Sequence, residues 1–121
     1  MIYKKADIIT EQPSNVRGGV GSPKMTNFMN HQTSQGVGRL FAMIEFDPGV
    51  SIGYHQHVGD QEAYYIISGV GTVEDNDGVK HDLEPGDCML CFDGESHSII
   101  NNGTEPLRFI AIVTYTGMVK G

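Results

Sequence analysis

The sequence contains no tryptophan, two cysteines and only eight lysine and arginine residues among its 121 residues. Fifteen acidic residues outnumber the basic ones, the formal net charge is −7, and the basic residues form no cluster. Recognition of nucleic acid or of an anionic membrane surface needs such a cluster, so we expect neither partner. The low cysteine content suits a reducing compartment better than an oxidising one.

Long apolar runs are also missing. The N-terminal segment MIYKKADIITEQP has early lysines but lacks the apolar stretch of a signal peptide. No other run approaches the length of a membrane span. These features predict a soluble, cytoplasmic protein. A length of 121 residues suits one domain and is too short for two ordinary ones, so we predict a single domain over residues 1–121.

Glycine, in contrast, is abundant, with 16 residues spread between short apolar runs. This pattern predicts many turns and little helix. From Val37 onward the turn signals recur about every eight to twelve residues, which is typical of a sandwich or a barrel. Residues 1–36 are predicted to form an irregular arm with a short strand at 25–31, and residues 37–116 the barrel core. The predicted core strands cover residues 37–46, 50–57, 62–68, 70–74, 79–83, 88–92, 97–101 and 107–115.

Two of the five histidines are almost adjacent. In a strand, His55 and His57 point to the same face with α-carbons roughly 7 Å apart, close enough to share one metal ion. Glu62 opens the next strand after the connection 58–61, and His97 begins a distant strand. A lone strand histidine is more often a hydrogen-bonded core or surface residue than a ligand, but this combination favours a metal site. His31, in an irregular region, and His81, among charges beside a turn, fit it less well.

Residues 49–69, GVSIGYHQHVGDQEAYYIISG, resemble the first motif of the cupin family. That motif runs Gly, five residues, His-x-His, three or four residues, Glu, six residues and Gly, and every specified position is filled. Residues 86–101 resemble the second motif at Gly86, Gly94, His97 and Asn101, with Phe92 where the family usually has proline. The difference alters a position that stiffens a turn and touches no ligand.

The resemblance implies an all-β fold, the cupin jelly-roll β-barrel. It also implies one divalent ion held by His55, His57, Glu62 and His97. A mixed imidazole and carboxylate set suits Mn, Fe, Ni, Cu or Zn, manganese being one candidate. If the ion is octahedral, two positions stay open for water, oxygen or a small anionic ligand such as a carboxylate. Dimerisation is common in the family, so a homodimer is expected.

Strand alternation sorts the neighbours of these residues into two faces. Tyr64 and Ile66 should face inward with Glu62, Ser51 and Gly53 with the histidine pair, and Ile99 with His97. The opposite set is too apolar for a solvated face, so we expect the N-terminal third or a second copy of the chain to cover it. This outward set comprises Ile52, Tyr54, Tyr65, Ile67 and Ile100.

Cys88 and Cys91 form a Cys-x-x-Cys sequence on a predicted strand. Residues three apart in a strand face opposite sides, and their α-carbons are about 10 Å apart, too far for a disulfide. We therefore interpret both cysteines as packing residues, one of which could line the cavity.

The chain has three arginines, each of which is a candidate for holding an anion. Arg39 begins the strand before the first motif, and Arg17 lies in a glycine-rich loop that resembles small cupins of the oxalate-decarboxylase-like type. The segment 94–99 shares that resemblance, whereas Arg108 is better interpreted as a surface charge. Tyr64, Arg39 and Arg17 are thus the candidate catalytic residues.

Three functions remain open. The first is a metal-dependent enzyme that decarboxylates or oxidises a small, oxalate-like carboxylate or another oxygen-rich molecule. The second is a non-catalytic module that binds or senses a metal and a small ligand, and the third is a sugar isomerase or epimerase. A decarboxylase needs a proton donor, yet no inward acid besides Glu62 is identifiable. Loop acids such as Asp60 and Glu95 could serve but are more often solvated.

Overall fold

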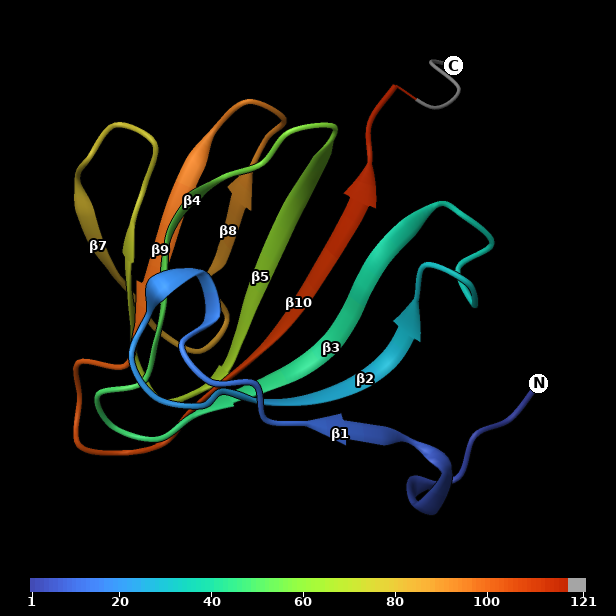
Figure 1. Ribbon diagram of the computed structural model, residues 1–121. Helices are drawn as coiled ribbons and strands as arrows, with labels where there is room; N and C mark the ends of the chain where they lie inside the picture. The colour runs from blue at the N-terminus through green and yellow to red at the C-terminus, as the bar shows by residue number, and fades with distance from the viewer. Residues whose placement is uncertain (118–121) are drawn as a thin grey trace.

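The computed structural model describes residues 1–117 and consists almost wholly of β-strands (Figure 1). Two 3-10 helices of one turn each, η1 (Lys5–Asp7) and η2 (Val16–Gly18), lie in the N-terminal part. None of the described helices is long and apolar enough to cross a membrane. The strands are β1 (Ile9–Glu11), β2 (Lys24–Asn30), β3 (Gly38–Phe46), β4 (Ser51–Gln56), β5 (Asp60–Ser68), β6 (Gly71–Glu74), β7 (Lys80–Leu83), β8 (Cys88–Cys91), β9 (Ser96–Ile100) and β10 (Leu107–Tyr115).

The strands form two antiparallel sheets, one of six strands in the order β1-β2-β3-β10-β5-β8 and one of four in the order β4-β9-β6-β7. This two-sheet arrangement is the jelly roll that the sequence predicted, but it is not a closed barrel. Among the described strands, β8 pairs only with β5 and β4 only with β9. No ladder among the described strands joins the edge of one sheet to the edge of the other, so the expectation of closure is corrected.

All eight strands predicted between residues 37 and 115 are present, and the short strand predicted at 25–31 is β2. The sequence analysis missed β1. The strands of residues 1–36 join the large sheet, because β1 pairs with β2 and β2 pairs along most of β3. The arm therefore widens the large sheet, as Figure 1 shows at the side where the N-terminus lies. The division into one domain over residues 1–121 stays a prediction.

The core lies between the two sheets and takes buried side chains from β3, β4, β5, β6, β8, β9 and β10, whereas β1, β2 and β7 contain no buried residue. Phe46 and Phe109 meet edge to face with ring centroids 5.2 Å apart. Tyr64, Ile66 and Ile99 are buried in this core, as alternation predicted. Fully burying a side chain of this size contributes roughly 1.5–3 kcal/mol to stability, so these rows hold the sheets together.

One inward and outward assignment was wrong. Ile52 was expected to face out, yet it is only 5% exposed and belongs to the core. The β4–β9 register shifts between Ile52 and His55, which resets the alternation at Gly53. A Cβ at Gly53 would lie 2.1 Å from the Arg17 carbonyl oxygen, so only glycine permits the η2 loop to approach this bulge.

The rest of the outward set behaves differently. Tyr54, Tyr65 and Ile67 are between 42% and 49% exposed, and Ile100 is half-buried. The N-terminal third does not cover the first three, because its η2 loop packs against β4 instead. Cover by a second copy stays a prediction.

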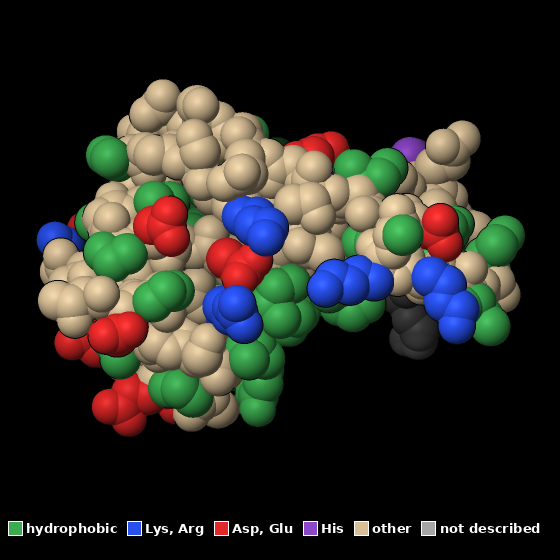
Figure 2. Space-filling view, turned by 90° about the horizontal axis from the view of Figure 1, so that it is seen from below, with side chains coloured by type: hydrophobic (Ala, Val, Ile, Leu, Met, Phe, Trp, Pro, Cys, Tyr) green, Lys and Arg blue, Asp and Glu red, His purple; other side chains and the backbone are tan. Residues whose placement is uncertain are grey.

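Basic and acidic side chains lie close together on the surface (Figure 2). Figure 2 shows basic side chains interspersed with acidic and apolar ones on the face that it displays, without a basic patch. Arg108 and Lys24 both pair with Glu45, at 2.8 Å and 3.7 Å. Arg108 is thus the surface charge that the sequence analysis favoured.

Candidate metal centre

Four side chains converge between the two sheets, each offering a ligand atom within 4.8 Å of the others. They are the four predicted ligands His55, His57, Glu62 and His97. Pairing of β4 with β9 places His55 directly opposite His97, and Glu62 reaches across from β5 of the other sheet. Backbone bonds between residue 57 and the turn before β9 hold His57 in place, since His57 donates to Glu95 and accepts from Gly94.

Three of the ligand atoms form a nearly equilateral triangle. Nε2 of His57 lies 3.1 Å from Nε2 of His97, and Oε1 of Glu62 lies 3.2 Å and 3.0 Å from these two nitrogens. Atoms about 2.1 Å from one ion lie about 3.0 Å apart at right angles and about 3.4 Å apart in a tetrahedron. The observed spacing of 3.0–3.2 Å is close to these values, so the residues present fit a single divalent ion.

The outer ring nitrogens of the histidines differ in their partners. Nδ1 of His55 donates to the Gly53 carbonyl at 2.7 Å, and Nδ1 of His57 lies 2.6 Å from Oδ1 of Asp60. Such outer bonds fix the ring so that Nε2 presents its lone pair to a metal. Nδ1 of His97 is buried without a hydrogen-bond partner among the described residues. The His97 ring instead stacks on Tyr64, with centroids 5.2 Å apart and planes inclined by 19°.

Burial and charge oppose each other at this cluster. Burial disfavours the ionised form of Glu62, but hydrogen bonds from His57 and His97 outweigh it and lower its pKa to about 2. The same bond to Glu62 raises the pKa of His57 against the effect of burial, whereas burial lowers the pKa of His55. Burial, reinforced by the charge of Glu62, raises the pKa of Tyr64 well above its ordinary value.

A cavity of about 70 Å³ adjoins the cluster. Its lining includes His55, His57 and Glu62, together with all three candidate catalytic residues. These three are Arg17, Arg39 and Tyr64. A larger hollow of about 400 Å³, between the β2–β3 turn and β10, is lined by no ionisable side chain among the described residues. The small cavity thus joins three of the predicted ligands with all three candidate catalytic residues.

The two arginines reach the cavity from different elements. Arg17 lies in η2 with a left-handed φ of 54°, a conformation uncommon for residues other than glycine and often associated with function. Arg39 comes from β3, and its Nε donates to Oδ2 of Asp60 at 2.8 Å. The two arginines thus place positive charge beside the cavity that adjoins the cluster.

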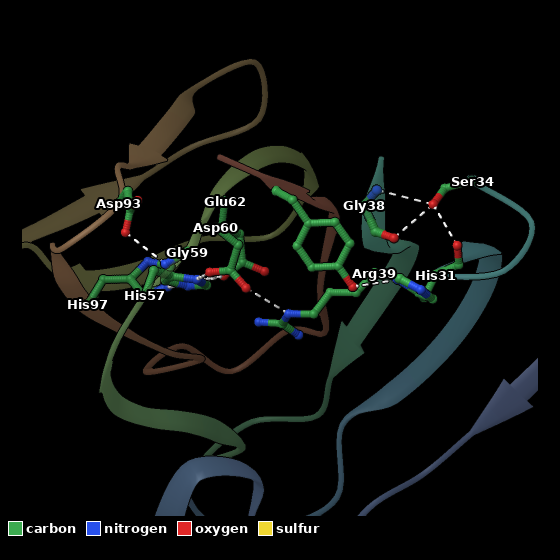
Figure 3. Close-up of polar contacts among 11 residues, drawn as sticks. His31, Ser34, Gly38, Arg39, His57, Gly59, Asp60, Glu62, Asp93 and His97 are labelled. Carbon is green, nitrogen blue, oxygen red and sulfur yellow. Dashed lines mark hydrogen bonds and ion pairs between the residues drawn. The ribbon is translucent and has the colours of Figure 1, made fainter. Parts of the chain in front are cut away.

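Asp60 is the residue that sequence reasoning missed. We expected a solvated loop acid, but Asp60 is only 7% exposed and bonds to both His57 and Arg39 (Figure 3). The only signal was its position three residues after His57, at the start of a strand. Glu95 is half-buried and accepts a hydrogen bond from the backbone of Phe92, which makes it a turn residue.

Comparison with known proteins agrees with this picture. Residues 42–113, well over half of the chain, match the family model described as the cupin domain. The chain belongs to the cupin family. This membership confirms the resemblance inferred from the two motifs.

This chain is also similar to several individual proteins. This cupin is 38% identical over 113 residues to an oxalate-binding protein of Thermotoga maritima, a match that covers 93% of each chain. The crystal structure of a predicted oxalate decarboxylase from T. maritima is similar with a TM-score of 0.87 and 37% identity, over 95% of this chain and 99% of that one. A putative sugar phosphate isomerase from Acidithiobacillus ferrooxidans is more distant, with a TM-score of 0.62 and 29% identity, over 75% of this chain and 59% of that one.

Proposed function

We propose that this cupin binds one divalent transition-metal ion and, on its open side, a small carboxylate of the oxalate class. His55, His57, Glu62 and His97 would hold the ion, for which Mn, Fe, Ni, Cu and Zn are all candidates. The observation that carries the proposal is the triangle of His57, His97 and Glu62 atoms, 3.0–3.2 Å apart, beside a cavity with two arginines. A divalent ion in this position supplies positive charge that polarises a bound carboxylate.

Charge and size favour a small anion. One divalent ion with the Glu62 carboxylate and three neutral imidazoles leaves a net charge near +1. Arg17 adds a further positive charge, whereas the charge of Arg39 is offset by its partner Asp60, so the sum is about +2. A dianion would balance this charge better than a neutral sugar. Drug-sized ligands occupy pockets of about 300–1,000 Å³, whereas this cavity measures about 70 Å³. Its size therefore disfavours the sugar isomerase hypothesis, and the similarity to an oxalate-binding protein supports the oxalate class.

Binding without turnover is the better supported version of this proposal. Decarboxylation leaves a carbanion-like product that must take up a proton. Among the described cavity-lining residues the only carboxylic acid is Glu62, which is assigned to the metal, and Tyr64 is a phenol and hence a weak acid. Decarboxylation or oxidation by dioxygen remains the second candidate, favoured by the similarity to a predicted oxalate decarboxylase.

The roles of the candidate catalytic residues follow from this proposal. Arg17 and Arg39 would hold the carboxylate groups of the anion by charge-assisted hydrogen bonds. Tyr64, stacked on His97, would orient that ring and line the cavity floor.

Calorimetric titration of oxalate into the metal-loaded and the metal-free protein tests the proposal. We expect binding only with metal, and at least about 10-fold weaker binding in Arg39→Met or Arg17→Met, the effect of one charge-assisted hydrogen bond. Arg108→Met, which removes a surface arginine paired with Glu45, is the matched control. Equal oxalate binding by metal-free protein would contradict the proposal, and release of carbon dioxide from oxalate would establish turnover.

A homodimer and a cytoplasmic location stay predictions. Several apolar side chains on the outer face of β5, β8 and β10 are 38–53% exposed, as an interface between two copies requires. They are Tyr65, Ile67, Leu90, Phe92 and Ile112. Sedimentation equilibrium at micromolar concentration checks the dimer, and a monomer would contradict it.

A further inference from the structure

Asp60 stands out among the acidic side chains because it is buried beside the candidate metal centre without being one of the four grouped ligands. Of the described acidic residues, only Asp60 and Glu62 are buried. A buried carboxylate is costly unless its oxygens are bound, so the partners of Asp60 indicate what it does. Figure 3 shows it between His57 and Arg39.

Each carboxylate oxygen of Asp60 has its own partner. Oδ1 lies 2.6 Å from Nδ1 of His57, and Oδ2 lies 2.8 Å from Nε of Arg39. Asp60 forms an ion pair with the guanidinium of Arg39, which can only donate, so it faces Arg39 as a carboxylate acceptor. An ionised carboxylate only accepts hydrogen bonds, and therefore Nδ1 of His57 carries the proton. Nε2 is the atom that faces Glu62 and His97, so once it gives up the proton with which it bonds to Glu62 its lone pair is available to a metal.

The backbone around Asp60 is fixed by strand pairing. Asp60 begins β5 and pairs in register with Tyr115 of β10. Gly59, just before it, has a left-handed φ of 77° and donates its N–H to Oδ1 of Asp93 at 2.8 Å. These contacts set the direction of the Asp60 side chain independently of any ligand.

The bond to Arg39 matters for the other half of the site. Because Arg39 uses Nε to reach Asp60, its two terminal amino groups are not needed for this bond. Arg39 also lines the cavity, so these groups can meet an anion there. The same carboxylate thus orients a metal ligand with one oxygen and an anion-binding arginine with the other.

We propose that Asp60 is a positioning residue that serves both the metal and the anion. It holds His57 in the tautomer that binds a metal through Nε2, and it holds Arg39 at the cavity wall. The proposal rests on the proposed metal and carboxylate function. It adds that the two binding events share one residue, which contacts neither ligand.

Asp60→Asn and Asp60→Ala test this role, with Zn²⁺ as the probe. The charge-matched control is Asp82→Asn, because Asp82 is exposed on β7 and bonds only to the Thr72 hydroxyl in the described structure. We expect Zn²⁺ affinity, measured by competition with a chromophoric chelator, to fall about 10–100-fold in both Asp60 variants. Asp82→Asn should keep the affinity of the unaltered protein. Arg39→Met should weaken oxalate binding at least about 10-fold.

A second readout is independent of bound metal. Long-range nitrogen–proton NMR correlations of the metal-free protein, recorded at a pH where the rings are neutral, report the tautomer of each histidine. We expect His57 to be protonated on Nδ1, and Asp60→Asn to shift it toward the Nε2-protonated form. A purely structural role for Asp60 would leave that tautomer unchanged.

The outcomes separate this proposal from the proposed function. An Nε2-protonated His57 in the unaltered protein, or full Zn²⁺ affinity in Asp60→Ala, overturns the role of Asp60 while metal binding stands. A protein that takes up no Zn²⁺ overturns the proposed function, and the tautomer measurement still decides whether Asp60 orients His57. If circular dichroism shows Asp60→Ala to be unfolded, the similarly sized Asp60→Asn decides the matter.

Discussion

Two groups of histidine and acidic side chains in this cupin bring their ligand atoms within 4.8 Å of one another, yet they differ in almost every other respect. The first is the buried candidate metal centre between the sheets. The second lies at the tip of the β6–β7 hairpin and consists of Asp75, Asp77 and His81.

The hairpin group is explained by the turn that carries it. Oδ1 of Asp75 accepts the N–H of Asn76 at 2.8 Å, and Oδ1 of Asp77 accepts the N–H of Val79 at 2.9 Å. Aspartates commonly bond to the backbone in turns in this way. The buried group instead joins strands of both sheets, and its carboxylate faces two imidazoles. Ligand atoms on one hairpin lie close together because the turn places them there. Side chains from two different sheets do not converge in the core without a further cause.

Removing a ligand from the buried cluster should cause the largest loss of bound metal. We expect the metal affinity of His97→Ala to fall by more than the roughly 10–100-fold that is typical when a hydrogen-bond partner of a ligand is removed, because here a ligand itself is gone. Glu62→Gln, which keeps the side-chain volume, should do the same, whereas His81→Ala on the hairpin should bind metal normally. Elemental analysis and chelator competition measure the loss. Full occupancy in His97→Ala would remove that residue from the ligand set.

Glycine substitutions should give the next largest effect. In Gly53→Ala the new Cβ meets the Arg17 carbonyl oxygen at 2.1 Å, so the η2 loop must move. We expect a loss of about 1–3 kcal/mol or more, which is typical of overpacking, together with weaker oxalate binding as Arg17 shifts.

The hairpin supplies the matched control for that variant. Gly78 has a left-handed φ of 78° but no atom near its Cβ position, so Gly78→Ala should cost only about 1–2 kcal/mol. Chemical denaturation measures both changes in the free energy of unfolding. Equal losses, with oxalate affinity preserved in Gly53→Ala, would show that the loop contact does not support the site.

The smallest effect is expected at the hairpin group itself. Asp77→Ala removes one exposed hydrogen bond to the Val79 N–H and should cost about 0.5–1.5 kcal/mol. Metal affinity should stay unchanged, because the carboxylate serves the turn. A metal loss in Asp77→Ala equal to that in His97→Ala would assign the ion to the hairpin and reverse the comparison.

Much of the site could be predicted from the sequence because β5 pairs regularly from Asp60 to Ile66. Alternation placed Glu62, Tyr64 and Ile66 on the inner face, and all three are buried. It failed at Ile52, because the bulge at Gly53 depends on the approach of a loop from distant residues. A periodicity rule holds only as far as the strand remains regular.

The open edges of the two sheets and the burial of Asp60 could not be predicted from the sequence, for a related reason. Alternation shows which side of a strand is buried, but not whether the edge strands β4 and β8 pair across the gap. The pairing of Asp60 with Arg39 joins β5 to β3, and nothing local in the chain indicates it. Non-local contacts of this kind became visible only in the folded structure.

The metal content of the purified protein tests most directly whether the buried cluster is a metal centre. The protein is stripped with a chelator, dialysed, and titrated with Mn²⁺ and Zn²⁺ while bound metal is counted by elemental analysis. We expect binding to saturate at one ion per chain in the unaltered protein and in His81→Ala, and we expect no bound ion in Glu62→Gln. An unaltered protein that takes up neither ion, or Glu62→Gln that saturates normally, would contradict this expectation.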